Sequence, residues 1–127
     1  MIDISDRGDL MTEQNLIRGK AFDNSAPLGP VLATPDEVPD DTSIKLQLNG
    51  EVKQHSSRDD FNFNIPELVQ DISGFMILDQ GDIISSRTPA VVGPLPDGDI
   101  ISNLVEGIFT FNHSVHIPLT LITTLFR

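Results

Sequence analysis

SIKLQLNGEVKQ, residues 43–54, carries the clearest structural signal in the sequence. In its first half, isoleucine and leucine alternate with polar residues, which is the period of a strand that buries one face. The dipeptide Asn49-Gly50 follows, and it supplies the two positive φ angles that a tight hairpin turn requires. The stretch therefore predicts a β-hairpin.

Downstream of this hairpin, residues 65–78 (IPELVQDISGFMIL) predict a helix. Apolar residues recur at the i, i+3, i+4, i+7 spacing of a helix with one buried face, and Pro66 and Glu67 suit its first turn. We expect it to be the only substantial helix. If its apolar face is buried, Leu68→Ala or Ile72→Ala should lower the free energy of unfolding by about 2–5 kcal/mol.

Short strands and long loops are predicted for most of the remaining sequence. Strands are expected at Ile83–Ser85, Ile100–Val105 and Gly107–Phe111, and the proline- and glycine-rich residues 87–99 predict a loop. Five prolines and glycines within residues 27–39 exclude a long helix there. Several strands, one main helix and long loops predict a mostly β, α+β domain.

The composition excludes several classes of function. The chain has 127 residues, a formal net charge of −11 and no cysteine. Nucleic-acid binding and docking on anionic lipid both need clustered Lys and Arg, so the charge argues against them. The lack of cysteine excludes a disulfide scaffold, a thiol nucleophile and a cysteine-ligated metal. The acidity fits adaptation to concentrated salt and ordinary acidic solubility equally well.

Neither a membrane span nor a secretion signal is expected. The longest apolar stretch, residues 117–126, has about ten residues and is interrupted by Pro118, whereas a spanning helix needs roughly 20. Residues 1–9 alternate charged and apolar side chains, which does not match the apolar core of a signal peptide. We therefore expect a cytoplasmic protein.

Four stretches, in this order and spacing, resemble the fumarylacetoacetate hydrolase family, whose members cleave, isomerise or decarboxylate β-diketo and related enol acids. They are IDISDRGD (2–9), RGKAFDNSAPLGP (18–30), LQLNGEVKQHS (46–56) and GDIISSRTPAVVGPLPDGD (81–99). The resemblance covers residues 2–112 and implies the mixed β-roll of that family's catalytic domain, truncated at its N-terminus. We expect residues 1–112 to form a partial catalytic domain.

We expect residues 113–127 to form an atypical apolar tail, and residues 116–127 have no match in the family pattern. The sequence leaves open whether this tail packs as an extra strand or stays as unpaired surface. His113 and His116 have a His-x-x-His spacing, but in a strand residues i and i+3 face opposite sides, so we expect no metal site there.

The resemblance also implies a metal site. Family members bind Mg²⁺ or a similar hard cation, such as Mn²⁺ or Ca²⁺, through a Glu-x-Glu pair and a later Asp, and Asp3 matches that Asp. The five glutamates of this chain include no Glu-x-Glu pair, so the implied site is incomplete in this chain. Because affinity for such cations depends on the number and charge of oxygen ligands, one carboxylate does not suffice. The alternative interpretation of Asp3 is a solvated acid near a terminus.

Three further residues match functional positions of the family. Lys20 matches a lysine that stabilises negative charge near the metal and substrate, which implies a catalytic role. Thr88 matches the threonine of a loop that contacts the substrate carboxylate, and Gln54 matches a polar position that faces the pocket. The alternatives are a surface lysine at 20 and a simple turn residue at 88.

The chain also departs from the family at positions near these residues. Arg87 and Val91 replace glycines of the substrate loop, Asn24 stands where threonine is usual, and Gly8 where Asp is usual. A β-branched residue such as Val91 is strained wherever a positive φ is needed.

The implied function is metal-dependent chemistry on a dicarboxylic keto or enol acid in aromatic-acid catabolism. The PLGP loop favours isomerisation of 2-hydroxyhepta-2,4-diene-1,7-dioate or 5-carboxymethyl-2-hydroxymuconate. Two alternatives stay open. In one, the chain is a catalytically incomplete fragment or remnant that acts only as a partner subunit, in a homodimer or with a related chain. In the other, it is a β-rich module that binds small acids without turnover.

Overall fold

The computed structural model describes residues 1–12, 14–86 and 88–117. The chain divides into two compact units. The first consists of Met1–Leu32 with Ser85–Thr88, and the second consists of Ala33–Ile84 with Pro89–Arg127. Each unit is described by itself below.

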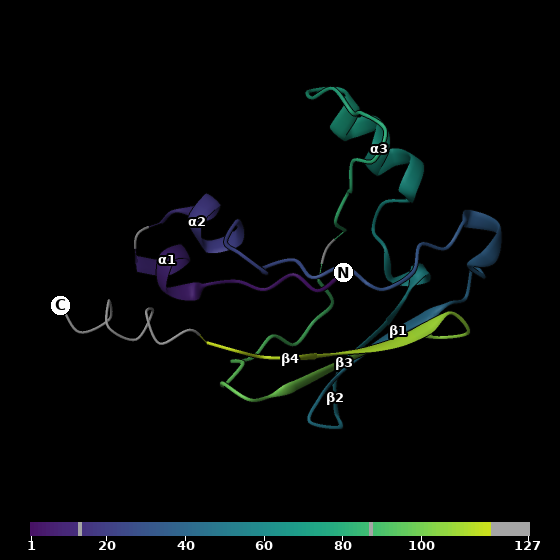
Figure 1. The fold of residues 1–127 in the computed structure, drawn as a ribbon. Coiled ribbons are helices and arrows are strands. Elements are labelled where there is room, and N and C mark those ends of the chain that lie inside the picture. The colour runs from purple at the N-terminus through teal and green to yellow at the C-terminus, as the bar shows by residue number, and fades with distance from the viewer. Residues whose placement is uncertain (13, 87, 118–127) are drawn as a thin grey trace. The chain divides into compact units, whose positions relative to one another are not determined.

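The first unit contains two short helices, α1 (Arg7–Thr12) and α2 (Leu16–Lys20) (Figure 1). Both helices begin with a side-chain cap. The Asp6 carboxylate accepts hydrogen bonds from the Gly8 and Asp9 N–H groups in the first turn of α1, and the Asn15 side-chain oxygen Oδ1 accepts one from the Arg18 N–H at 3.0 Å. Such caps satisfy N–H groups that have no partner inside a short helix.

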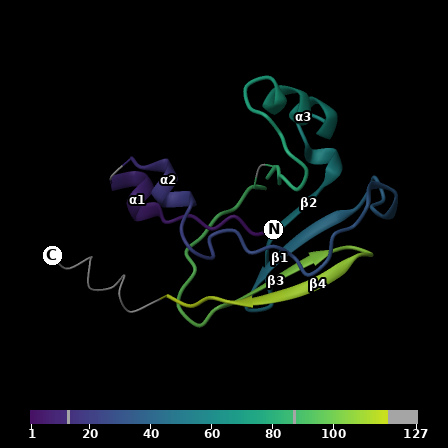
Figure 2. The ribbon, with the colours of Figure 1, turned by 45° about the horizontal axis from the view of Figure 1, so that its top comes forward.

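The second unit is built on an antiparallel sheet, which has four strands in the described residues (Figures 1 and 2). Their spatial order is β2-β1-β3-β4. The strands are β1 (Ser43–Leu48), β2 (Glu51–Ser57), β3 (Ile100–Val105) and β4 (Phe109–Ser114). Two 3₁₀ turns, Pro35–Glu37 and Arg58–Asp60, and the helix α3 (Ile65–Ser73) complete this unit. The mostly β, α+β fold class predicted from the sequence is confirmed.

The predicted hairpin is confirmed as β1 and β2. Asn49 and Gly50 have φ angles of 51° and 84°, as a tight two-residue turn requires. The turn is also held from β3, because the Ile100 N–H donates to the Asn49 side-chain oxygen at 2.9 Å and the Asn49 amide donates to Asp99 at 2.9 Å. These two hydrogen bonds therefore tie the hairpin turn to the chain at the start of β3.

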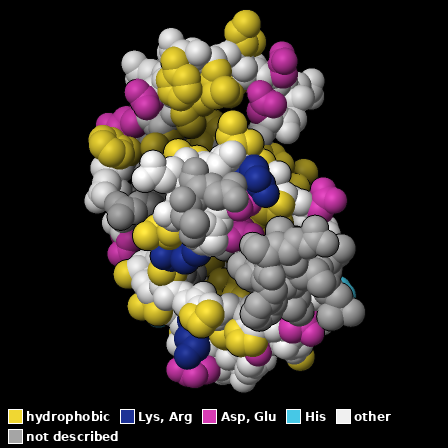
Figure 3. Space-filling model, turned by 90° about the vertical axis from the view of Figure 1, so that its left-hand side faces the viewer, with side chains coloured by type: hydrophobic (Ala, Val, Ile, Leu, Met, Phe, Trp, Pro, Cys, Tyr) yellow, Lys and Arg dark blue, Asp and Glu magenta, His cyan; other side chains and the backbone are white. Residues whose placement is uncertain are grey.

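Helix α3 is confirmed, but it is shorter than predicted and its apolar face is not buried. Asn64 and Glu67 form a reciprocal capping box at its start, with Pro66 in the first turn. The helix ends at Ser73, not at residue 78, with Gly74 as its C-cap residue. None of its residues is buried, and Ile65 is 48% exposed. Hydrophobic side chains gather over α3 and the segment that follows it, at the top of the view in Figure 3.

Two of the predicted strands need correction. The strand expected at Ile83–Ser85 is wrong, since these residues follow the Asp79–Asp82 turn as irregular chain that pairs with none of the four strands. The strand expected at Gly107–Phe111 begins instead at Phe109 and continues to Ser114. Its start is displaced because Gly107, with a φ of 76°, belongs to the turn after β3.

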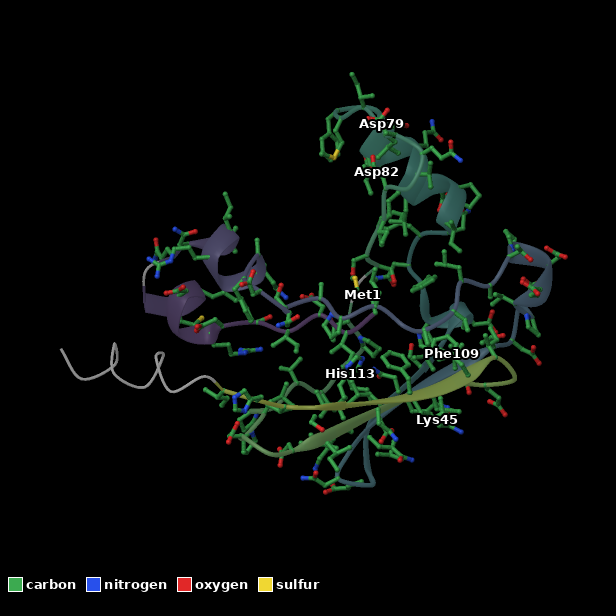
Figure 4. All side chains as sticks on the ribbon, viewed as in Figure 1. Met1, Lys45, Asp79, Asp82, Phe109 and His113 are labelled. Atoms are coloured by element: carbon green, nitrogen blue, oxygen red, sulfur yellow. The ribbon has the colours of Figure 1, made fainter. Side chains whose placement is uncertain are left out.

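The strand register gives the sheet two different faces. Gln54, Leu46, Asn103 and Phe111 are cross-strand partners in one row, so their side chains share a face. In the next row along, residues 55, 45, 104 and 110 are partners and face the opposite side. Figure 4 agrees, with Phe109 and His113 rising from one face and Lys45 from the other. Ile101, which is only 1% exposed, is the best buried apolar side chain of the described residues.

Candidate functional site

The structure brings Asp3 and Lys20 into direct contact within the first unit. The Lys20 Nζ lies 2.7 Å from Asp3 Oδ2, so the two residues form a hydrogen-bonded ion pair across 17 positions of sequence. The side chains are 42% and 38% exposed for Lys20 and Asp3, respectively. The ammonium and the carboxylate are therefore both open to solvent and to a ligand.

Backbone pairing explains how two residues so distant in sequence meet. The Ile2 N–H donates to the Pro27 carbonyl at 3.1 Å, and the Ile4 N–H donates to the Ser25 carbonyl at 2.8 Å. These two bonds hold the N-terminal segment alongside the residues that follow α2. Asp3, which lies between them, is thereby fixed beside the end of that helix.

Hydrogen bonds also fix the backbone at Lys20. The buried Ser25 donates its hydroxyl to the Lys20 carbonyl at 2.8 Å, and the Asp6 N–H donates to the Gly19 carbonyl at 2.9 Å. Gly19 is buried where Leu10 of α1 reaches α2: a Cβ at this position would lie 2.4 Å from Leu10 Cγ. The close approach of the two helices therefore depends on a residue without a side chain.

Thr88 is exposed and belongs to the same compact unit as Asp3 and Lys20. Gln54 lies on β2 in the second unit. Its amide Nε2 donates to the Val91 carbonyl at 2.6 Å. The structure thus brings Asp3 and Lys20 together, and it places Gln54 against the loop that follows Thr88 in sequence.

Two of the departures from the family pattern take unusual backbone conformations. Val91 has a φ of 75° and Asn24 a φ of 62°. Asn adopts this left-handed region readily, whereas for a β-branched residue such as Val91 it is an outlier. The strain predicted at Val91 from its sequence is confirmed. Arg87, which stands at the other glycine position of this loop, lies outside the described residues.

The two histidines of the His-x-x-His spacing have separate surroundings. His113 lies on β4, and its ring packs edge-on against Phe111 with centroids 4.8 Å apart. His116 lies beyond β4, with Nδ1 3.4 Å from the Asp97 carboxylate. His113 Nε2 and Asn103 Nδ2 are buried without a hydrogen-bond partner in the described part of the chain.

A complete divalent-metal site is not formed by the described residues alone. Within residues 1–12, 14–86 and 88–117, no three His, Asp or Glu side chains are grouped closely enough to hold a metal ion. Asp3 offers one carboxylate, and its neighbour is the cationic Lys20. Because a hard cation needs several oxygen ligands, the residues present do not fit the whole site that the family resemblance implies.

Sequence reasoning missed the residues that support Lys20. Ser25 and Gly19 are both buried and order the end of α2, but serine and glycine are common in loops and carry no spacing signal of their own. The signal that could have found Gly19 is a small residue inside a short helix, where glycine is unfavourable unless a close contact requires it.

Comparison with known proteins matches most of the chain to one family. The pattern that defines the fumarylacetoacetate (FAA) hydrolase C-terminal domain matches residues 1–116. The chain belongs to the fumarylacetoacetate hydrolase family. A protein of Pyrococcus abyssi is 44% identical over 97 residues, which cover 76% of this chain and 43% of that protein.

Two solved structures of family members are similar to this chain. The 5-carboxymethyl-2-hydroxymuconate delta-isomerase of Mycobacterium smegmatis aligns with a TM-score of 0.81 and 38% identity, over 88% of this chain and 44% of that enzyme. The maleylpyruvate hydrolase of Sphingobium sp. SYK-6, in complex with manganese(II) and pyruvate, aligns with a TM-score of 0.74 and 33% identity. That alignment covers 79% of this chain and 39% of the hydrolase.

These similarities establish the family's fold for this chain. The relatives include hydrolases and isomerases that act on small molecules, and the chain spans less than half the length of the relatives given above. Among the described residues of this family member, no helix is long and apolar enough to cross a membrane.

Proposed function

We propose that this chain takes part in hydrolase or isomerase chemistry on a dicarboxylic keto or enol acid. The substrate class is that of 5-carboxymethyl-2-hydroxymuconate and 2-hydroxyhepta-2,4-diene-1,7-dioate, intermediates of aromatic-acid catabolism in the cytoplasm. The observation that carries the proposal is the 2.7 Å contact between Lys20 and Asp3, made by residues that both match functional positions of the family.

Each proposed site residue has a chemical role that its side chain can fill. The Lys20 ammonium stabilises the negative charge that develops on the enolate oxygen of the substrate. The Thr88 hydroxyl, with backbone N–H groups of its loop, binds a substrate carboxylate. For Gln54, which lies on β2, the substrate-facing role that the family resemblance implies stays a prediction.

Asp3 is the one metal ligand that we assign to this chain. A divalent cation such as Mg²⁺, Mn²⁺ or Ca²⁺ polarises keto and enol oxygens when it is bound. The manganese in the Sphingobium hydrolase supports a divalent ion for the family. Because the described residues do not complete such a site, further carboxylates must come from outside them.

The second candidate function is that of a partner subunit without a complete active site. The observation behind it is that no three His, Asp or Glu side chains of the described residues are grouped closely enough to hold a metal ion. The partner would be a second copy or a related chain that supplies the remaining carboxylates.

Substitutions at the ion pair test the enzyme proposal. We expect Asp3→Asn to abolish dependence of turnover on added Mg²⁺ or Mn²⁺, and Lys20→Ala to lower kcat by about 10²–10³-fold through loss of one electrostatic stabiliser. The assay follows the absorbance of 5-carboxymethyl-2-hydroxymuconate, and calorimetry follows binding of the metal alone.

Two variants serve as matched controls. Asp23→Asn removes an exposed carboxylate of the same unit, and Lys53→Ala removes a lysine paired with Glu51 in the hairpin. Both should leave turnover unchanged. Absence of both turnover and metal binding at millimolar metal contradicts the enzyme proposal, and without carboxylate binding it favours the partner-subunit function. Carboxylate binding that depends on Thr88 but gives no turnover indicates a small-acid binding module.

A further inference from the structure

Val91 holds a backbone conformation that its side chain disfavours. Its φ of 75° lies in the left-handed region, where a β-branched residue meets its own backbone. The other non-glycine residues with positive φ in the described chain are Gln14, Asn24 and Asn49, none of which is β-branched. Strain of this kind persists only where surrounding contacts outweigh it.

The Val91 side chain does not provide that compensation. It is 63% exposed, and the residues around it contain Pro89, Gly93 and Pro94 in irregular chain. Burial of an isopropyl group therefore does not hold the backbone in place, and neither does a ladder of strand hydrogen bonds.

Gln54 makes the contact that can hold this backbone. Its Nε2 donates to the Val91 carbonyl at 2.6 Å, which joins residues 37 positions apart. Gln54 lies within β2, opposite Leu46 and next to the irregularity in the β1–β2 register. The donor is thus mounted on a paired strand, whereas the acceptor lies in a loop.

We propose that Gln54 is a positioning residue that clamps the strained backbone at Val91 and so fixes the loop that leaves Thr88. This inference rests on the proposed function for the role of that loop in binding a substrate carboxylate. It differs from a direct substrate contact by Gln54, because one amide N–H is already used within the protein. Loss of the clamp releases the strain and loosens the loop.

Limited proteolysis of the full chain tests the clamp without any substrate. Gln54→Glu keeps the shape of the side chain, removes the donor and places a carboxylate against a carbonyl oxygen. We expect thermolysin cleavage on the N-terminal side of Val91 and Val92, identified by mass spectrometry, to be accelerated at least about tenfold, because local opening becomes easier. Gln47→Glu, the same change on the opposite face of the sheet, is the control and should leave cleavage at these bonds unchanged.

A double-mutant cycle separates the clamp from a general structural role. Val91→Gly removes the backbone strain, so the loop no longer depends on Gln54. We expect Val91→Gly to raise the unfolding midpoint by a few degrees and to suppress most of the effect of Gln54→Glu on cleavage before Val92. Equal effects of Gln54→Glu in the two backgrounds overturn the proposal, as does an unchanged loop in the single variant.

The outcomes also separate this inference from the proposed function. If Gln54→Glu and Val91→Gly are coupled but the chain shows no turnover, the clamp is supported and the enzyme proposal is contradicted. If the chain is active but the two substitutions are not coupled, the clamp is contradicted and the enzyme proposal is unaffected. If Gln54→Glu does not fold, an unchanged unfolding midpoint in Val91→Gly is enough to overturn the inference.

Discussion

At the scale of single residues, the site depends on how closely the two short helices approach. Lys20 reaches Asp3 only because the end of α2 is fixed by the Ser25 hydroxyl and by the bond from the Asp6 N–H to the Gly19 carbonyl. The buried Gly19 leaves no space for a methyl group beside Leu10. One small residue thus sets the position of the cation that we propose to act on the substrate.

Gly19→Ala tests this dependence. The added Cβ would lie 2.4 Å from Leu10 Cγ and 3.1 Å from the backbone oxygen of Asp6, so both the leucine and the backbone must shift. We expect the free energy of unfolding of this unit to fall by about 1–3 kcal/mol, as in other overpacked contacts. Urea unfolding measures the loss.

Gly93→Ala is the matched control, because a Cβ there meets nothing within 4 Å. It should change the unfolding free energy by less than about 0.5 kcal/mol, as is usual for substitutions without a special contact. A loss in Gly19→Ala no larger than in this control contradicts the packing argument.

At the scale of elements, α3 shows which part of a helix the sequence predicts. The apolar period and the Asn64–Glu67 capping box specified its existence and its start. Its end and its burial were not predictable, because the apolar period continues through Phe75 and Met76 although the helix stops at Ser73. These two residues are 74% and 53% exposed. A periodic pattern shows which face is apolar, but not whether anything covers it.

The exposure of α3 changes the expected cost of truncating its apolar side chains. Leu68 and Ile72 are only half-buried, so Leu68→Ala should lower the free energy of unfolding by about 1 kcal/mol, below the 2–5 kcal/mol typical of a fully buried leucine. Chemical denaturation of the full chain measures this. A loss above about 2 kcal/mol would show that the face is covered in solution, and Gln70→Ala on the polar side is the control.

At the scale of the whole molecule, local sequence patterns predicted single elements but not the pairings between distant strands. The hairpin followed from residues 43–54 alone, whereas the pairing of β1 with β3 joins Ile44 to Val105, and no local pattern encodes such a pairing. The same holds for the site. The family resemblance selected Asp3 and Lys20, but their 2.7 Å contact results from backbone pairing with residues 25–27. Sequence periodicity specifies elements, and tertiary contacts specify which elements meet.

The sheet also has a pH-sensitive connection between distant segments. The Ser43 hydroxyl, at the start of β1, donates to the Glu106 carboxylate just after β3. This hydrogen bond, with smaller contributions from Lys45 and His55, holds the pKa of Glu106 below its ordinary value of 4.5. The ionised carboxylate is therefore favoured in the folded chain, and Glu106 adds stability at neutral pH.

Acid should remove this contribution. A carboxylate whose pKa is lower in the folded than in the unfolded chain stabilises the fold above its unfolded value and loses that contribution as pH falls through its folded value. The difference in unfolding free energy between the natural chain and Ser43→Ala should therefore be present at pH 7 and shrink below about pH 4.5. Urea unfolding of both chains from pH 7 to pH 3 measures it. Acid also relieves the self-repulsion of a chain with a net charge of −11, and the comparison of the two chains cancels this effect. A difference in unfolding free energy that stays constant from pH 7 to pH 3 would show that the hydrogen bond does not favour the ionised form.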